Sequence, residues 1–171
     1  VTVNQSATAV AAATVVGYTA GAVTVNDKNT ASTTLADTIE TVNVKNAGVV
    51  TIDSGALKTL KLEGTITSVT ATDATVKTGI TAVDTLALNL SGVNMSGTAA
   101  IDTDVKTLNI ASSTAASTVT TLTSAGATAI NVSGDAALTV TNLGAGAANQ
   151  VITVTNTAGV TIGTAALGND V

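Results

Sequence analysis

The sequence Thr107-Leu108-Asn109-Ile110 decides the fold, because the same pattern returns along the chain at a nearly fixed distance. In each copy a small or polar residue alternates with a branched aliphatic one. The clear copies start at residues 41, 59, 85, 107, 129 and 151, and the last four are 22 residues apart. The two earlier gaps, 18 and 26 residues, sum to two periods. Weaker copies stand at Val1–Val3 and Ala22–Val25. Such a period is typical of a repeat architecture.

Within each copy the side chains alternate with period two, which predicts a half-buried β-strand. The density of β-branched Thr and Val also favours strand over helix. Two positions per copy should face inward, and all twelve are branched aliphatics: Val42, Val44, Leu60, Leu62, Leu86, Leu88, Leu108, Ile110, Ile130, Val132, Ile152 and Val154.

A corner and a second strand are expected after each copy. Five places after the start the chain reads Asn46, Gly64, Leu90, Ser112, Gly134 and Asn156. Gly and Asn tolerate the left-handed backbone of a sharp corner. Leu90 breaks the pattern but is followed by Ser91-Gly92, so the corner should fall later there. The second strands are predicted at Val49–Ile52, Ile66–Ala71, Thr118–Thr123, Leu138–Val140 and Val160–Ile162.

The composition agrees with a core of many thin layers. Of the 171 residues 45% are apolar, yet the chain has one Tyr, one Met and no Phe or Trp. We therefore predict an all-β fold, a parallel β-solenoid with about 22 residues per coil and seven to eight coils. The usual crossover preference makes it right-handed. Residues 1–171 form a single solenoid domain, with 1–36 less regular and 37–171 in regular repeats. Because the repeat approaches both ends without polar caps, we interpret the chain as a fragment of a longer protein.

The residue types exclude several function classes. The chain has no His or Cys, which rules out a Ser-His triad, a Cys nucleophile and an ordinary zinc site. The net charge of −5 and the absence of Arg disfavour nucleic acid. The uncharged residues 1–26 lack the basic region of a signal peptide and the apolar run of a transmembrane segment. We expect no enzyme; paired carboxylates leave a sugar-cleaving β-helix as the catalytic alternative.

Two sets of charged residues are candidate sites. Glu40, Lys58, Asp84 and Lys106 precede successive copies and alternate in sign, which predicts a ladder of ion pairs that sets the register, or alternatively an ionic contact surface. Asp102 and Asp104 place two carboxylates on one side of an extended segment, and calcium is the cation that such oxygen ligands suit. Asp27, Asp53, Asp73 and Asp135 also stand near turns, where we expect solvated carboxylates.

The Thr/Val/Ala/Gly-rich composition and the repeats VKTLNIAS (105–112) and VDTLALNLSG (83–92) resemble the β-solenoid regions of Gram-negative surface-layer (S-layer) proteins. These are the calcium-dependent, RTX-like kind exported by type I secretion. The resemblance implies an extracellular, cell-surface location, calcium, and self-association into a two-dimensional lattice. The Gly- and Asp-rich calcium nonapeptide of that family is missing here. The alternative is an adhesin stalk or fibre segment that binds a host surface or a polysaccharide.

Overall fold

The computed structural model describes residues 1–5, 20–75, 77–144, 146–147 and 149–165. Residues 6–19 of the uncharged N-terminal segment lie outside this description. Regular structure in the described part consists of eleven strands: β1 (Thr2–Asn4), β2 (Val23–Asn26), β3 (Thr41–Asp53), β4 (Thr59–Thr72), β5 (Thr85–Ile101), β6 (Thr107–Ser112), β7 (Ser117–Thr123), β8 (Ala129–Gly134), β9 (Leu138–Leu143), β10 (Val151–Val154) and β11 (Val160–Ala165). Within these ranges no helix has the length and apolar character needed to cross a membrane.

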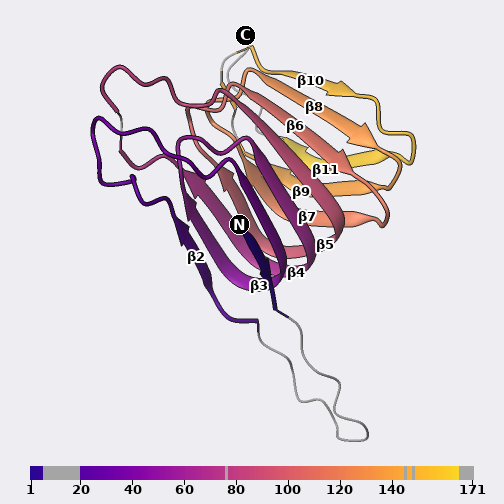
Figure 1. Cartoon of the computed structure of the whole chain (residues 1–171). Coiled ribbons are helices and arrows are strands. Elements are labelled where there is room, and N and C mark those ends of the chain that lie inside the picture. The colour runs from indigo at the N-terminus through magenta and orange to yellow at the C-terminus, as the bar shows by residue number, and fades with distance from the viewer. Residues whose placement is uncertain (6–19, 76, 145, 148, 166–171) are drawn as a thin grey trace, which may run out of the picture.

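The strands form two walls that face each other across the core (Figure 1). The first wall is the ladder β1-β3-β4-β5-β6-β8-β10. The second wall contains β2, the later parts of β3, β4 and β5, and then β7, β9 and β11. All the pairings are parallel, as expected when each coil repeats the path of the one before. The predicted second strands are confirmed as the second wall.

The walls meet at what we call the bend edge. In β3, β4 and β5 one strand runs around the bend, whereas the later coils break into two strands there. The backbone is left-handed at Asn46, Gly64 and Gly134, which confirms three expected corners, and Gly92 has a φ of 58° where the corner was predicted to fall later. In the coil of Ser112 the left-handed residue is Thr114 instead.

The parallel β-solenoid is thus confirmed, with about 22 residues per turn, but it has about six turns and not seven to eight. The difference arises at the N-terminus, where Thr2 pairs with Asn43, 41 positions later, so this segment makes one turn where two periods were expected. The weak copy at Ala22–Val25 does not join the first wall. Its residues fall in β2, which pairs with Val50–Asp53 on the second wall.

The register between β4 and β5 differs from the expected alignment by two residues. Thr59 lies opposite Ala87, whereas the repeat starts predict that it faces Thr85. A shift of two residues keeps every side chain on its own face of the sheet, because strand side chains alternate with period two. The inward positions therefore survive an error in the pairing.

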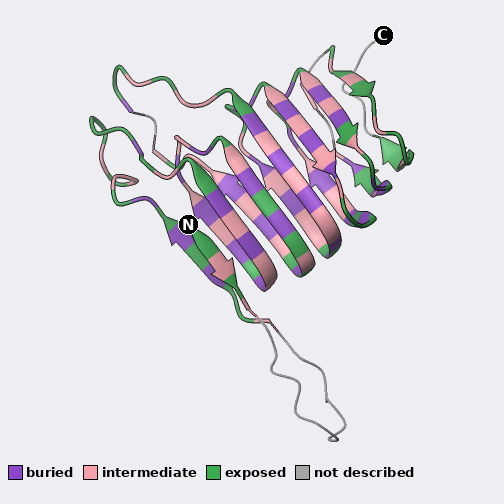
Figure 2. Ribbon diagram, turned by 45° about the vertical axis from the view of Figure 1, so that its right-hand side comes forward, coloured by how far each residue is buried: buried purple, intermediate pink, exposed green. Residues whose placement is uncertain are grey.

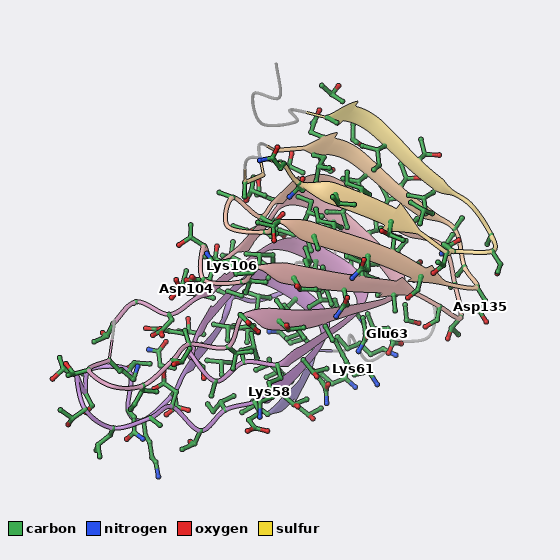
Figure 3. All side chains as sticks on the ribbon, turned by 90° about the horizontal axis from the view of Figure 1, so that it is seen from above. Lys58, Lys61, Glu63, Asp104, Lys106 and Asp135 are labelled. Carbon is green, nitrogen blue, oxygen red and sulfur yellow. The ribbon has the colours of Figure 1, made fainter. Side chains whose placement is uncertain are left out.

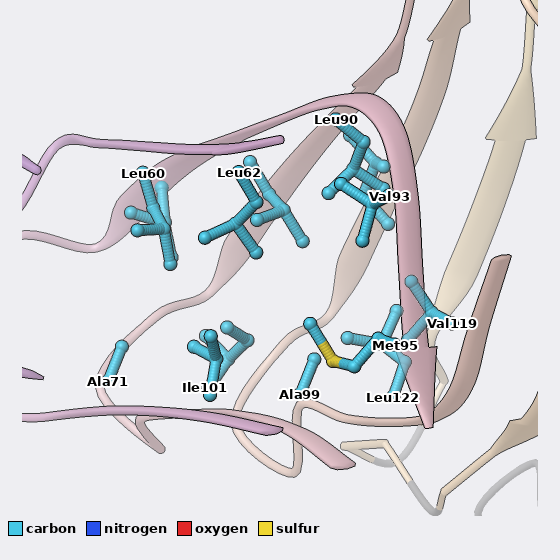
Figure 4. Close-up of a cluster of buried hydrophobic side chains, with 14 of the residues drawn as sticks. Leu60, Leu62, Ala71, Leu90, Val93, Met95, Ala99, Ile101, Val119 and Leu122 are labelled. Atoms are coloured by element: carbon cyan, nitrogen blue, oxygen red, sulfur yellow. The ribbon is translucent and has the colours of Figure 1, made fainter. Parts of the chain in front are cut away.

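The core is a double layer of aliphatic side chains between the walls. Figure 2 shows buried residues alternating with more exposed ones along the strands, and Figure 4 shows Leu60 and Leu62 on one layer facing Ala71 and Ile101 on the other. Ten of the twelve predicted inward residues are buried. Ile152 is partly buried and Val154 is 49% exposed, because β10 has a strand partner on one side only among the described strands.

Candidate functional site

The connections from the second wall of one coil to the first wall of the next form the edge opposite the bend, which we call the loop edge. It consists of the segments 27–40, 54–58, 73–84, 102–106 and 124–128. Two of them, 27–40 and 73–84, extend beyond the walls and lie side by side (Figure 1). The backbone N–H of Thr78 donates to the Thr33 carbonyl at 2.7 Å, which joins the two segments directly.

Asp27 anchors the first of these segments from inside. It is 2% exposed, and its carboxylate accepts hydrogen bonds from the backbone N–H groups of Asn29, Thr38 and Ile39 and from the Thr38 hydroxyl. Burial alone would raise the pKa of Asp27, but these donors stabilise the charged form and bring the pKa below its ordinary value of 3.8. The expectation of a solvated carboxylate is wrong at this position.

A second buried cluster joins the two segments through Lys77. Its Nζ lies 2.7 Å from Asp37 Oδ2 and 3.4 Å from Asp73 Oδ1. The exposed fractions of the three side chains are 3% for Lys77, 1% for Asp37 and 11% for Asp73. The hydrogen bond to Asp37 raises the pKa of Lys77 above its usual value, although burial works in the opposite direction. The cluster therefore holds one cation between two carboxylates out of water.

The surroundings of this cluster combine one open side with close backbone contacts. A cleft of about 230 Å³ is lined by all three charged side chains and by small or aliphatic residues that include Ala56, Ile80 and Val83. Asp37 Oδ2 also accepts a hydrogen bond from the Gly55 N–H at 2.8 Å, whereas the buried Oδ1 has no partner. The cluster thus offers an amine, an incompletely bonded carboxyl group and a second carboxylate within hydrogen-bond reach.

The candidate calcium ligands Asp102 and Asp104 occupy different positions. Asp102 accepts backbone hydrogen bonds on both oxygens, from the Asp73 N–H at 2.8 Å and the Asp104 N–H at 2.7 Å. Asp104 is exposed on the loop edge beside Lys106 (Figure 3). No group of three or more acidic residues with metal-binding geometry occurs in the part of the chain that the structure describes. Calcium binding by this pair stays a prediction.

The other turn carboxylates connect neighbouring coils. Asp53 Oδ1 accepts the Ala74 N–H at 3.0 Å, and Asp135 Oδ1 accepts the Thr114 N–H at 3.4 Å. Together with the bonds of Asp37 and Asp102, these contacts satisfy amides that the strand ladder leaves unpaired at the edges. Acidic residues at the turns therefore have a structural role that does not require a cation.

The alternating charge column forms one ion pair out of three. Lys58 Nζ lies 2.7 Å from Glu40 Oε1, and both side chains are more than half exposed. The two-residue shift between β4 and β5 displaces Asp84 from Lys58. Lys106 Nζ donates to the Thr103 carbonyl at 2.6 Å and not to the neighbouring Asp84. A continuous ionic ladder is therefore wrong for this column.

The outer face of the second wall is a surface that sequence reasoning missed. None of its segments, 23–26, 47–52, 65–72, 93–101, 117–123, 138–143 and 160–165, contains a charged residue. One outward column runs in register through five coils and consists of Thr65, Asn94, Thr118, Thr139 and Thr161. The first wall carries Lys45, Lys61 and Glu63, and Lys45 forms an ion pair with Glu63. The two walls thus differ in charge.

Sequence reasoning also missed Asp37 and Lys77. A signal was present, because the 26-residue gap between the copies at 59 and 85 exceeds the period and contains Asp73 and Lys77. The partner Asp37 precedes the first clear copy and belongs to no repeat position. No protein-family model matches the chain, and no characterised protein shows significant sequence similarity to it.

Proposed function

We propose that this chain is a structural module of an extracellular, self-assembling surface layer, in which a rigid solenoid provides lattice contacts. The observation that carries the proposal is the uncharged outer face of the second wall, whose outward residues are Thr, Ser, Asn, Ala, Gly and one Val across successive coils. The resemblance of the repeats to those of S-layer proteins supports the same conclusion.

Rigidity follows from the way in which the backbone is paired. Each coil between the first and the last is hydrogen-bonded to a coil on either side along both walls. Bending such a rod would stretch many of these bonds together, so the walls stay flat relative to each other. A lattice needs subunits of this kind, because small errors in subunit shape accumulate over many repeats.

The second wall suits a contact between subunits. The centres of protein interfaces are depleted of charged residues, because burying an unpaired charge is costly. Thr and Asn side chains of this face present hydroxyl and amide groups that hydrogen-bond without that cost. We propose that this wall faces a neighbouring subunit and that the charged first wall remains in water, or faces cell-surface polysaccharide.

Two substitutions in the same coil test which wall makes the contact. Thr141 and Ser133 are both exposed, one on the second wall in β9 and one on the first wall in β8. Thr141→Arg should abolish ordered sheets in negative-stain electron microscopy of the full-length protein, and Ser133→Arg should leave them intact. The reverse result would assign the contact to the first wall. Isolated fibres from the unaltered protein would support the adhesin alternative instead.

The role of calcium is tested in the same assay. The proposal expects sheets with calcium and dispersed protein after chelation, since the resembling family assembles in that way. Asp104→Asn removes an exposed carboxylate that no backbone bond holds in place, while leaving Asp102 and its two amide contacts unchanged. If Asp104 is a ligand within this module, the variant should require more calcium. An unchanged requirement would place the calcium sites elsewhere in the protein.

A further inference from the structure

The Lys77 cluster has the geometry of a reactive site as well as that of a salt bridge. Its amine nitrogen is 2.7 Å from a carboxyl oxygen of Asp37, and the two side chains are 3% and 1% exposed. The exposed pair of Lys58 and Glu40 has the same 2.7 Å separation, but both of its side chains are more than half exposed. Burial is therefore what separates the two pairs.

Burial matters because it changes the most stable form of the pair. Moving one proton from the ammonium to the carboxylate gives a neutral amine beside a neutral carboxylic acid, with no change in the number of bound protons. Water favours the charged form strongly, whereas a low-dielectric surrounding reduces that preference. The neutral amine is the nucleophilic form of lysine. The unpartnered Asp37 Oδ1 shows that the carboxylate is incompletely stabilised where it lies.

The remaining groups are placed for an acyl-transfer step. The Gly55 N–H donates to Asp37 Oδ2 at 2.8 Å and would stabilise negative charge that develops on that oxygen. Asp73 Oδ1 lies 3.4 Å from Lys77 Nζ, within reach to accept a proton. The Asp73 backbone is itself held by Asp102, and the bond between Thr78 and Thr33 fixes the two segments next to the reacting pair.

We propose that Lys77 and Asp37 form an intramolecular amide bond, with Asp73 as the proton carrier. The neutral amine attacks Cγ of Asp37, and the Nζ–Cγ bond forms. The bond from Cγ to one carboxyl oxygen then breaks. The Asp73 carboxylate takes a proton from Nζ and passes it to the leaving hydroxyl, so one water molecule departs. No oxidant, reductant or cofactor is consumed.

Asp37 is the acceptor and Asp73 the proton carrier for two reasons. Asp37 is closer to the amine and carries the Gly55 hydrogen bond, whereas Asp73 is farther away and more exposed. The resulting cross-link joins positions 40 residues apart and encloses all of β3 and β4. It would fasten the two extended segments of the loop edge together. The proposal does not depend on the role in a surface layer.

Intact mass spectrometry of the purified, denatured chain tests this directly. The expected mass is lower than the sequence mass by one water molecule. After trypsin digestion, cleavage after Lys77 should be lost, and peptide 29–45 should be joined to peptide 62–106. An intact mass equal to the sequence mass would overturn the proposal. So would a water loss confined to one peptide, or a link from Lys77 to Asp73.

Variants then separate the roles of the three residues. Lys77→Arg and Asp37→Ala should each restore the full mass. Asp73→Asn keeps the shape of the side chain but cannot carry the proton, so the water loss should vanish or become much slower after refolding. Lys106→Arg alters an exposed lysine of the same edge and should keep the water loss. A linked product that forms at the same rate in Asp73→Asn would refute the assignment of Asp73.

Discussion

The two halves of the solenoid are built on the same walls but are held together differently. From β6 onward the first-wall strands follow each other at 22 residues, and the buried polar side chains are serines only: Ser112, Ser117 and Ser124. From β1 to β5 the spacing varies between 18 and 28 residues beyond the first turn, and Asp27, Asp37 and Lys77 are buried. Where the period is exact in length, the repeat alone aligns the coils. Where it is not, specific buried charges fix the extra residues.

The largest expected effect is one that the two halves should share, because both have the same aliphatic core. Leu108 in the regular half and Leu60 in the irregular half are each 0% exposed. Leu108→Asp should cost more than the about 2–5 kcal/mol typical of truncating a buried leucine, because an unpaired carboxylate is also buried. Urea unfolding followed by circular dichroism measures it. A much smaller effect for Leu60→Asp would show that the halves do not share one core.

The next effect should be confined to the irregular half. Lys77→Met removes the cation and leaves Asp37 and Asp73 facing each other out of water, so we expect a loss of about 3–5 kcal/mol in the free energy of unfolding. The direction is the same whether the native contact is an ion pair or an amide.

The exposed Lys58 provides the control for that measurement. Lys58→Met breaks the pair with Glu40, in which both side chains are more than half exposed, and should change stability by about 0–1 kcal/mol. Equal thermal shifts for the two lysine variants would mean that the Lys77 cluster is accessible to water. The buried cluster would then have no special role in aligning the irregular coils.

The same contrast explains what the sequence could predict. Alternating residues such as Leu108 and Asn109 indicate strands and faces, because every copy repeats the same burial. Pairing between strands is a different matter, since a shift of two residues preserves all faces and costs the pattern nothing. The glycines held the missing information: Gly64 and Gly92 are both left-handed corners, and their separation of 28 equals the spacing from Thr59 to Ala87. Aligning corners would have corrected the register.

Asp37 and Lys77 could not be predicted in the same way. They occur once each, at no repeat position, and the contact between them depends on how two long segments fold beside the walls. A single sequence contains no periodic signal for such a pair. The uncharged second wall, in contrast, was readable in the sequence once the corners divide each coil into its two walls.

A smaller effect concerns acid stability and again distinguishes the irregular half. The pKa of Asp27 is lowered in the folded chain, so its carboxylate contributes stability above the ordinary value of 3.8, and this contribution is lost as the pH falls through the folded pKa. The difference in stability between the unaltered chain and Asp27→Asn should therefore be largest near neutral pH and shrink below about pH 4. Thermal unfolding across this range measures it. A difference that does not vary with pH would contradict the role of the charged form.

The smallest effect is expected at Asn109, next to the residue whose substitution should be most damaging. Asn109 faces outward and its Oδ1 accepts a hydrogen bond from Asn131 Nδ2 at 2.8 Å, an acceptor that Asn109→Asp retains. Surface changes of this kind usually stay within about 0.5 kcal/mol. Asn109→Asp and Leu108→Asp place the same carboxylate one position apart, so the difference between their unfolding free energies isolates the direction in which the side chain points. Similar losses for the two variants would mean that β6 is not a strand with one buried face, and the two walls would have to be reassigned from that coil outward.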